Sequence, residues 1–224
     1  LEQDYDPETI DLFCDDVMQA AEDSRYIQVD GKPLVMIYQL NKLPNVQDVI
    51  HRIRQRFRRL RQQEIALATV FNDAFDPAWE KLVDIIVQFP PHRTPRVSMR
   101  KLMSADEVHP HGPDRGDFFE SYDLVSKSSL EAVDTFEKLH PGVCPDWDNS
   151  PRRAKNANIL IGSSPEKFEH WVKHASTSTL RKFELGNIVA PFLFVNAWNE
   201  WAEGAFIEPS AKHECAYLEA LARG

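Results

Sequence analysis

The sequence predicts an α/β protein built on a parallel sheet, and three observations support this fold class. Short apolar runs, each about the length of one strand, alternate with longer segments whose apolar residues recur at helical spacing. Strands that alternate with helices form parallel sheets, because each helix returns the chain to the same end of the sheet. The chain has only eight glycines and no glycine-rich phosphate loop, which favours a barrel, or part of one, over an open nucleotide-binding sheet.

The predicted strands are almost wholly apolar, as strands covered on both faces are. The first follows the Asp30-Gly31 turn and runs from Pro33 to Tyr38. The last follows Pro191, begins with four consecutive apolar residues and ends at Trp198. In chain order, the predicted strands are residues 33–38, 65–70, 84–89, 142–147 and 192–198.

The predicted helices begin with recognisable N-terminal signals. Pro7 suits a first helical turn, and the acidic residues after it suit the positive end of the helix dipole. Ser164 suits an N-cap, with Pro165 at the first helical position. The predicted helical segments are residues 7–22, 46–62, 76–82 and 121–137, one that begins at Ser164, and 211–222.

Residues 90–118 are rich in proline and histidine and have no apolar period. A stretch of this length without structure is uncommon in a compact domain and is usually a functional loop or disordered. We expect a lid or a loop that contributes to sugar specificity. His109 and His111 have no third ligand at a recognised spacing, so we expect no metal and no cofactor.

Composition excludes several classes of partner. With 26 basic and 35 acidic residues the net charge is −9, which argues against nucleic-acid binding. The arginine-rich run at residues 51–61 keeps its apolar residues at core spacing and is interpreted as the solvated face of a helix. The longest apolar stretch has 11 residues, against roughly 20 for a membrane span. The three cysteines form no disulfide or zinc pattern, so we expect a cytoplasmic protein.

The densest chemical signal lies directly after the last predicted strand. Glu200 and Glu203 are three residues apart, and a helical turn there would place both carboxyls on one side. Two carboxyls about 5–5.5 Å apart are typical of retaining glycosidases, and their repulsion raises the pKa of one so that it can act as an acid. Trp198, Asn199 and Trp201 would then contact the sugar. The alternative is a pair of solvated loop acids beside core tryptophans.

A second group of candidates follows the predicted strand 142–147. Trp147 would stack on a sugar, Asp148 and Asn149 would bind its hydroxyls, and Arg152 would hold a carboxylate. The alternative is a capped turn with surface arginines. Tyr38, at the end of its own strand, is either a site hydroxyl or a packing residue, and Glu208 is expected to hold its loop rather than to react.

Residues 196–209 closely resemble the NAWNEWAEG…EP signature of WbsX-like proteins, a family associated with bacterial O-antigen lipopolysaccharide and polysaccharide biosynthesis. That family is similar to glycoside hydrolase family 99, the endo-acting α-mannosidases and α-mannanases, whose active sites carry NEWxEG…EP. Further landmarks of the family occur in the same order, at residues 26–33, 88–92, 144–153 and 162–171. Several matched segments in order are far more specific than one motif.

The resemblance implies that residues 1–224 form a single domain, the C-terminal part of a (β/α)8 TIM-like barrel. The predicted strands would be the fourth to the eighth, with the N-terminal strands missing. We therefore expect a truncated chain whose partners include the missing barrel segment or further domains of a longer protein, beside an oligosaccharide or polysaccharide substrate.

The resemblance also implies the chemistry. Glu200 would deprotonate a mannose 2-hydroxyl, which attacks the anomeric carbon, while Glu203 would protonate the leaving oxygen and then activate water, with net retention. The expected substrate is an α-linked glycan that contains mannose. Whether the enzyme is an endo-type hydrolase or a glycosyltransferase stays open, and the rival from another class is a catalytically inactive carbohydrate-binding remnant.

Overall fold

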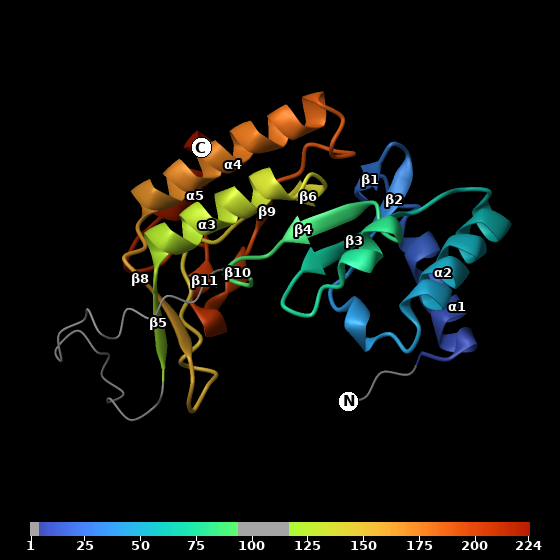
Figure 1. Cartoon of the computed structure of the whole chain (residues 1–224), viewed down its shortest axis with the longest axis horizontal. Coiled ribbons are helices and arrows are strands. Elements are labelled where there is room, and N and C mark those ends of the chain that lie inside the picture. The colour runs from blue at the N-terminus through green and yellow to red at the C-terminus, as the bar shows by residue number, and fades with distance from the viewer. Residues whose placement is uncertain (1–4, 94–116) are drawn as a thin grey trace.

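The computed structural model describes residues 5–93 and 117–224 (Figure 1). Its main sheet has the strand order β1-β2-β3-β4-β6, in which β1 is antiparallel to β2 and the other neighbours are parallel. The predicted parallel α/β fold is thereby confirmed. The strands of this sheet are β1 (Gln28–Val29), β2 (Lys32–Ile37), β3 (Ala66–Phe71), β4 (Ile85–Gln88) and β6 (Leu139–His140).

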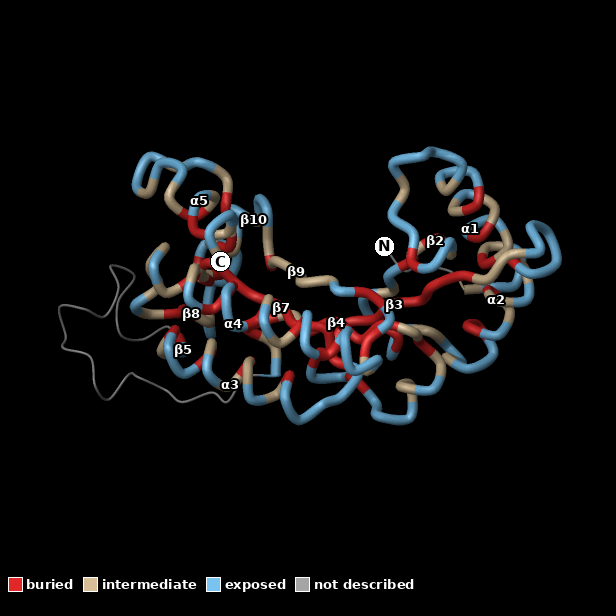
Figure 2. The backbone as a smooth tube through the Cα atoms, turned by 90° about the horizontal axis from the view of Figure 1, so that it is seen from above, coloured by how far each residue is buried: buried red, intermediate tan, exposed pale blue. Residues whose placement is uncertain are grey.

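The sheet continues across Pro141 into a second parallel pair. β7 (Gly142–Val143) follows β6 directly and pairs with β9 (Phe194–Val195). Seen from above, the path through β3, β4, β7 and β9 bends into an arc, a curled half-barrel sheet (Figure 2). Gly142 permits this close packing, because a Cβ there would lie 2.0 Å from the Gln88 carbonyl oxygen.

Two predicted strands are shorter than expected. Only residues 142–143 of the predicted strand 142–147 pair in β7, and the chain leaves the sheet before Pro145, which has no N–H to donate to a ladder. The predicted strand 192–198 pairs only over β9. The extra length of both segments forms loops at the carboxyl edge of the sheet, where a site can be built.

The sequence analysis missed a further parallel pair, β5 (Phe118–Ser121) with β8 (Asn158–Ile161). β5 has the sequence FFES and β8 the sequence NILI, and mainly polar residues or glycine surround both, so neither stands out as an apolar run. The start of β5 belongs to the stretch 90–118 that was expected to be a loop. Residues 94–116 of that stretch lie outside the described residues, and the expected lid lies there with them.

The helices agree closely with the predicted segments, and α3 and α4 lie along the convex side of the arc (Figure 2). The Ser164 side chain accepts a hydrogen bond from the Lys167 N–H, which confirms the predicted N-cap. The last helix begins about five residues later than predicted. The helices are α1 (Pro7–Ala20), α2 (Val46–Arg61), α3 (Tyr122–Thr135), α4 (Pro165–Glu184) and α5 (Ala216–Arg223), with 3-10 turns at Leu40–Lys42 and Pro77–Lys81.

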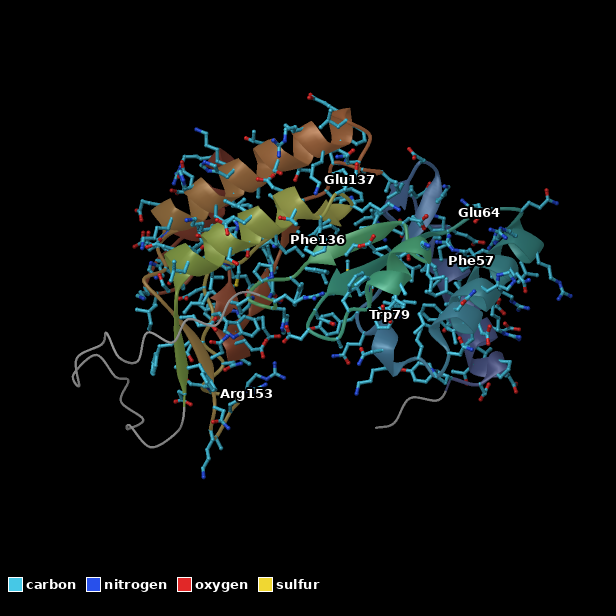
Figure 3. All side chains as sticks on the ribbon, viewed as in Figure 1. Phe57, Glu64, Trp79, Phe136, Glu137 and Arg153 are labelled. Carbon is cyan, nitrogen blue, oxygen red and sulfur yellow. The ribbon has the colours of Figure 1, made fainter. Side chains whose placement is uncertain are left out.

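Two large apolar clusters hold the helices against the sheet. One joins α1 and α2 to the outer faces of β2 and β3 and includes Phe57 and Trp79, both labelled in Figure 3. The other lies under α3, α4 and α5 and includes Trp171, which is 1% exposed. A smaller cluster with Ala66 and Val87 lies on the concave side of the sheet.

The arginines of α2 are engaged in ion pairs with acids of neighbouring elements. Arg52 contacts Asp11 at 2.9 Å and Arg56 contacts Asp15 at 2.8 Å, so these pairs join α2 to α1. Arg54 reaches Asp84 at 2.8 Å beside the start of β4. This arrangement agrees with the interpretation of the run as a partly solvated helix face. Within residues 5–93 and 117–224, none of the helices is both long and apolar enough to cross a membrane.

Candidate functional site

The candidate site is assembled from segments that follow different strands of the curled sheet. Tyr38 follows β2, His92 follows β4, Trp147 follows β7, and the loop with both glutamates follows β9. These strands run parallel, so their carboxyl ends meet at one edge. The active sites of parallel α/β folds lie at this edge.

The glutamates lie in a small hairpin after β9. β10 (Asn199–Glu200) pairs antiparallel with β11 (Ala205–Phe206), and a 3-10 turn at Trp201–Glu203 joins them. Glu203 is the last residue of this turn, whereas Glu200, with φ −83° and ψ 71°, comes directly before it as the last residue of β10. Gly204 ends the turn with φ +64°, a conformation that glycine adopts without strain.

The glutamate hairpin packs closely on the loop after β7. The Asp148 N–H donates to the Glu203 carbonyl oxygen at 2.7 Å. A Cβ on Gly204 would lie 3.0 Å from the Asp148 nitrogen, so a larger residue here would push the Asp148 backbone away by a few tenths of an ångström. The backbone of Glu203 is therefore held by a contact with a separate strand end.

The carboxyl group of Glu203 has the electrostatics expected of a proton donor. Its side chain is 22% exposed, and burial raises its pKa. The charges of Arg152 and Arg153 lower this pKa, whereas that of Glu200 raises it, so Glu200 lies close enough to act on Glu203. The net direction is upward, as general-acid catalysis at neutral pH requires. Arg152 Nη1 lies 3.0 Å from Glu203 Oε1, so the arginine contacts this carboxylate directly.

Tyr38 lies within electrostatic reach of the same carboxylate. Burial and the charge of Glu203 raise the pKa of Tyr38. Its hydroxyl lies 3.4 Å from Nε2 of His92, and the edge of His92 approaches Trp147, with 6.3 Å between ring centroids. Tyr38 is 42% exposed, so its hydroxyl is available to a ligand. Its ring also packs edge-on against Phe89, with 5.6 Å between centroids, so the site role of Tyr38 stays a prediction.

The two loop tryptophans are exposed and held by one carboxylate. Trp198 is 55% exposed and Trp201 is 48% exposed. Their indole N–H groups donate to the two oxygens of Glu208, at 3.1 Å from Trp198 and 2.7 Å from Trp201. Trp201 also stacks on Phe206, with ring centroids 3.6 Å apart. The alternative of tryptophans buried in the core is therefore wrong for this pair.

The residues after β7 have mainly structural contacts. Trp147 is 5% exposed and packs in the cluster under α4, and Asp148 Oδ1 accepts from the Ser150 N–H at 2.9 Å. Asn149 is 5% exposed, and its Oδ1 accepts from the Asn158 N–H at 2.8 Å. These contacts favour the capped-turn alternative, and a sugar contact by these three residues stays a prediction.

Two features of the site went unrecognised in the sequence. His92 was counted in the long loop 90–118 and in the family landmark 88–92 and was given no role in the site, yet it lies beside Tyr38 after β4. Its position just after an apolar strand was the signal that could have placed it. The ion pair between Arg152 and Glu203 had no sequence signal, because 51 positions separate the two residues.

Among the described residues, histidine, cysteine and acidic side chains do not gather in groups of three or more that could hold a metal ion. The site combines exposed indoles, a tyrosine hydroxyl, an arginine and paired carboxylates. Flat apolar faces beside hydrogen-bonding groups are suited to a polar ring molecule such as a sugar.

A curled parallel sheet with helices along its convex side, and carboxylates at its strand ends, places the chain among the α/β proteins related to TIM barrels. The chain belongs to the WbsX glycosyltransferase family, whose family model, described as "Glycosyltransferase WbsX", matches residues 1–221. The expected family membership is thereby confirmed.

Among curated proteins, the chain is similar to "Uncharacterized protein WxcX" of Xanthomonas campestris pv. campestris strain B100. The two are 30% identical over 210 residues, which are 93% of this chain and 29% of that protein. The protein of the same name from strain ATCC 33913 matches with the same identity and coverage. The chain thus spans less than a third of the length of these relatives.

Two solved structures share the fold. One, described as a "Glycoside hydrolase-like protein", has a TM-score of 0.66 and 16% identity, and the match covers 98% of this chain and 61% of that one. The other is the GH99 endo-alpha-mannosidase from Bacteroides thetaiotaomicron, with a TM-score of 0.53, 12% identity, and coverage of 98% of this chain and 60% of that one. These two likenesses show the fold of the chain.

Proposed function

We propose that this chain carries the catalytic carboxylates of an enzyme that acts on α-linked glycans containing mannose, with retention of configuration. The single observation that carries the proposal is the hairpin after β9. It carries both Glu200 and Glu203, and burial raises the pKa of Glu203, which the charge of Glu200 raises further. One carboxylate and one carboxylic acid side by side are what retaining glycoside cleavage requires.

In the proposed reaction, Glu200 accepts the proton of the sugar 2-hydroxyl while that oxygen attacks the anomeric carbon. Glu203 donates its proton to the departing glycosidic oxygen, so the bond to the leaving group breaks as the 1,2-anhydro bond forms. Glu203, now ionised, then removes a proton from the incoming hydroxyl, which opens the anhydro ring. The proton on Glu200 returns to the 2-oxygen, and both carboxyls regain their starting states.

The incoming hydroxyl decides the reaction class. Water gives an endo-type hydrolase, and a sugar hydroxyl gives a transferase. The family name points to transfer, whereas the names of both structural neighbours point to hydrolysis. Product release measured with and without an added acceptor glycan and nucleotide sugar separates these two classes.

We also propose that the chain is a single domain that provides strands four to eight of a complete barrel. The concave face supports this, because barrel interiors are normally filled by side chains. Met36 points to this face and is 41% exposed, and Phe194 is only partly buried there. Further polypeptide, in the same chain or another, would cover these residues and complete the sugar site.

The decisive experiment uses the longest natural form of the protein that contains these residues, assayed on α-linked mannan oligosaccharides. Glu203→Gln is expected to lower kcat at least a thousandfold while sugar binding stays within a few-fold of the parent. Glu131→Gln, an equivalent change on exposed α3, is the control. A Glu203→Gln protein with parental turnover would exclude the proposed acid, and a parent that binds but never turns over would identify an inactive binding protein.

A further inference from the structure

The carboxylate of Glu208 stands out because one side chain satisfies two exposed indoles. Oε1 accepts from Trp198 Nε1 at 3.1 Å, and Oε2 accepts from Trp201 Nε1 at 2.7 Å. An indole N–H is a donor only, so its orientation is determined by the acceptor it finds. Exposed indoles are otherwise free to donate to water in several rotamers.

The backbone around Glu208 is anchored to the same hairpin. The N–H groups of Ile207 and Glu208 donate to the Trp198 carbonyl oxygen, at 3.0 and 3.3 Å. Ile207 is buried, and the residue after Glu208 is a proline, whose ring restricts its own φ. The carboxylate is therefore a well-positioned acceptor that moves little relative to the two rings.

Holding the rings also affects the candidate catalytic turn. Trp201 lies between Glu200 and Glu203 in sequence and is the first residue of the 3-10 turn. One face of its indole is covered by Phe206, at 3.6 Å between centroids and an interplanar angle of 17°, so the opposite face is the one left for a ligand. A rotation of the Trp201 side chain would move this face, and the 3-10 turn would lose the side-chain contact that ties it to Glu208.

We propose that Glu208 is a positioning residue for the carbohydrate site: its carboxylate fixes the indoles of Trp198 and Trp201 as one platform for a pyranose ring and steadies the turn between Glu200 and Glu203. This inference rests on the proposed function. Each oxygen of Glu208 accepts one hydrogen bond from an indole N–H, so the role assigned to this carboxylate is to position the rings and not to transfer a proton.

Chemistry explains why a carboxylate is needed at this position. Two equivalent acceptor oxygens serve two donors at once, and hydrogen bonds to a charged acceptor are stronger than neutral ones. A glutamine has one acceptor oxygen, and its amide group would face the second indole with another donor. Glu208→Gln should therefore release one ring while it preserves the size and the backbone of the loop.

The test combines Glu208→Gln with Trp198→Phe and Trp201→Phe, which keep an aromatic face but remove the N–H. Three quantities are measured in the natural protein: the NMR signals of the indole N–H groups, the Kd for an α-linked mannotetraose, and the split between KM and kcat. Glu208→Gln should shift the N–H signals of Trp198 and Trp201 upfield, raise Kd roughly tenfold and raise KM more than it lowers kcat. In the Trp198→Phe/Trp201→Phe background it should have almost no further effect.

Glu214→Gln, an exposed acid in the following loop, is the matched control and should change none of these quantities. Unchanged indole signals and Kd in Glu208→Gln would overturn the proposal, and so would an equal loss of affinity in the double-phenylalanine background. If Glu208→Gln does not fold, the single variants Trp198→Phe and Trp201→Phe still test the role of Glu208. Each keeps an aromatic ring but loses the N–H that Glu208 accepts from, and each should weaken mannotetraose binding. The NMR signals need no substrate. They therefore test whether Glu208 holds the two indoles even if Glu203→Gln disproves the proposed reaction.

Discussion

Arg152 and Glu203 form an ion pair, with 3.0 Å between Nη1 and Oε1, although they belong to loops after different strands. The Arg152 side chain is 53% exposed, whereas that of Glu203 is 22% exposed. Burial and the arginine act on the pKa of Glu203 in opposite directions, and burial is the larger effect. The arginine therefore reduces the upward shift in the pKa of Glu203 without reversing it.

Removing this arginine should shift the pH profile of the enzyme. In Arg152→Met the charge that lowers the pKa of Glu203 is gone, so this pKa rises further and the acid stays protonated to higher pH. The basic limb of kcat/KM against pH should move upward by about half a unit or more. Arg153→Met is the comparison and should move it less, because Arg153 has the smaller effect on the same carboxyl. A downward shift in Arg152→Met would contradict this assignment.

Gly204→Ala should destabilise the protein for two separable reasons. Alanine must adopt φ +64°, and its Cβ would lie 3.0 Å from the Asp148 nitrogen. The positive φ alone costs about 1 kcal/mol, and the contact should bring the loss in free energy of unfolding to about 2 kcal/mol. Gly186→Ala is the control, because Gly186 has φ +73° and a Cβ added there would meet no atom within 4 Å. Equal losses in urea unfolding would mean that the two loops are not tightly packed together.

Acidification should unfold the protein partly through His140. This side chain is fully buried, and burial lowers its pKa to about 4. The unfolded chain, with a histidine pKa of about 6.5, binds the proton more tightly, so stability is lost as the pH falls from about 6.5 to about 4. The loss should be about 3 kcal/mol. His140→Leu should flatten this part of the stability curve, and an unchanged slope in this variant would contradict the assignment.

Gln88 should not tolerate replacement by its charged counterpart. The side chain is 5% exposed, its Nε2 donates to the Ser129 carbonyl oxygen at 2.8 Å, and its Oε1 accepts from the Gly142 N–H at 3.3 Å. In Gln88→Glu a carboxylate oxygen would face that carbonyl oxygen, so the free energy of unfolding should fall by about 2–3 kcal/mol at neutral pH. The loss should shrink as the pH falls and the carboxyl takes up a proton. A loss independent of pH would point to packing rather than charge.

Local patterns were enough to predict much of this fold. The central strands 33–38, 65–70 and 84–89 agree with β2, β3 and β4 to within two residues at either end, because runs of buried apolar residues carry their own signal. The helix beginning at Ser164 was recognised from its cap. β5 and β8 were missed because four-residue strands depend on each other across a long sequence separation.

Patterns formed by residues close together in the sequence were sufficient to predict the parallel α/β class and to recognise the family signature. They also showed that Glu200 and Glu203 follow an apolar strand, three residues apart. Folding was needed to bring Arg152 to Glu203, to place His92 beside Tyr38 and to join two indoles through Glu208. This division arises because the pKa of a carboxyl and the orientation of a ring depend on burial and on charges from other strand ends. The curl of the sheet selects those neighbours, and they lie far away in the sequence.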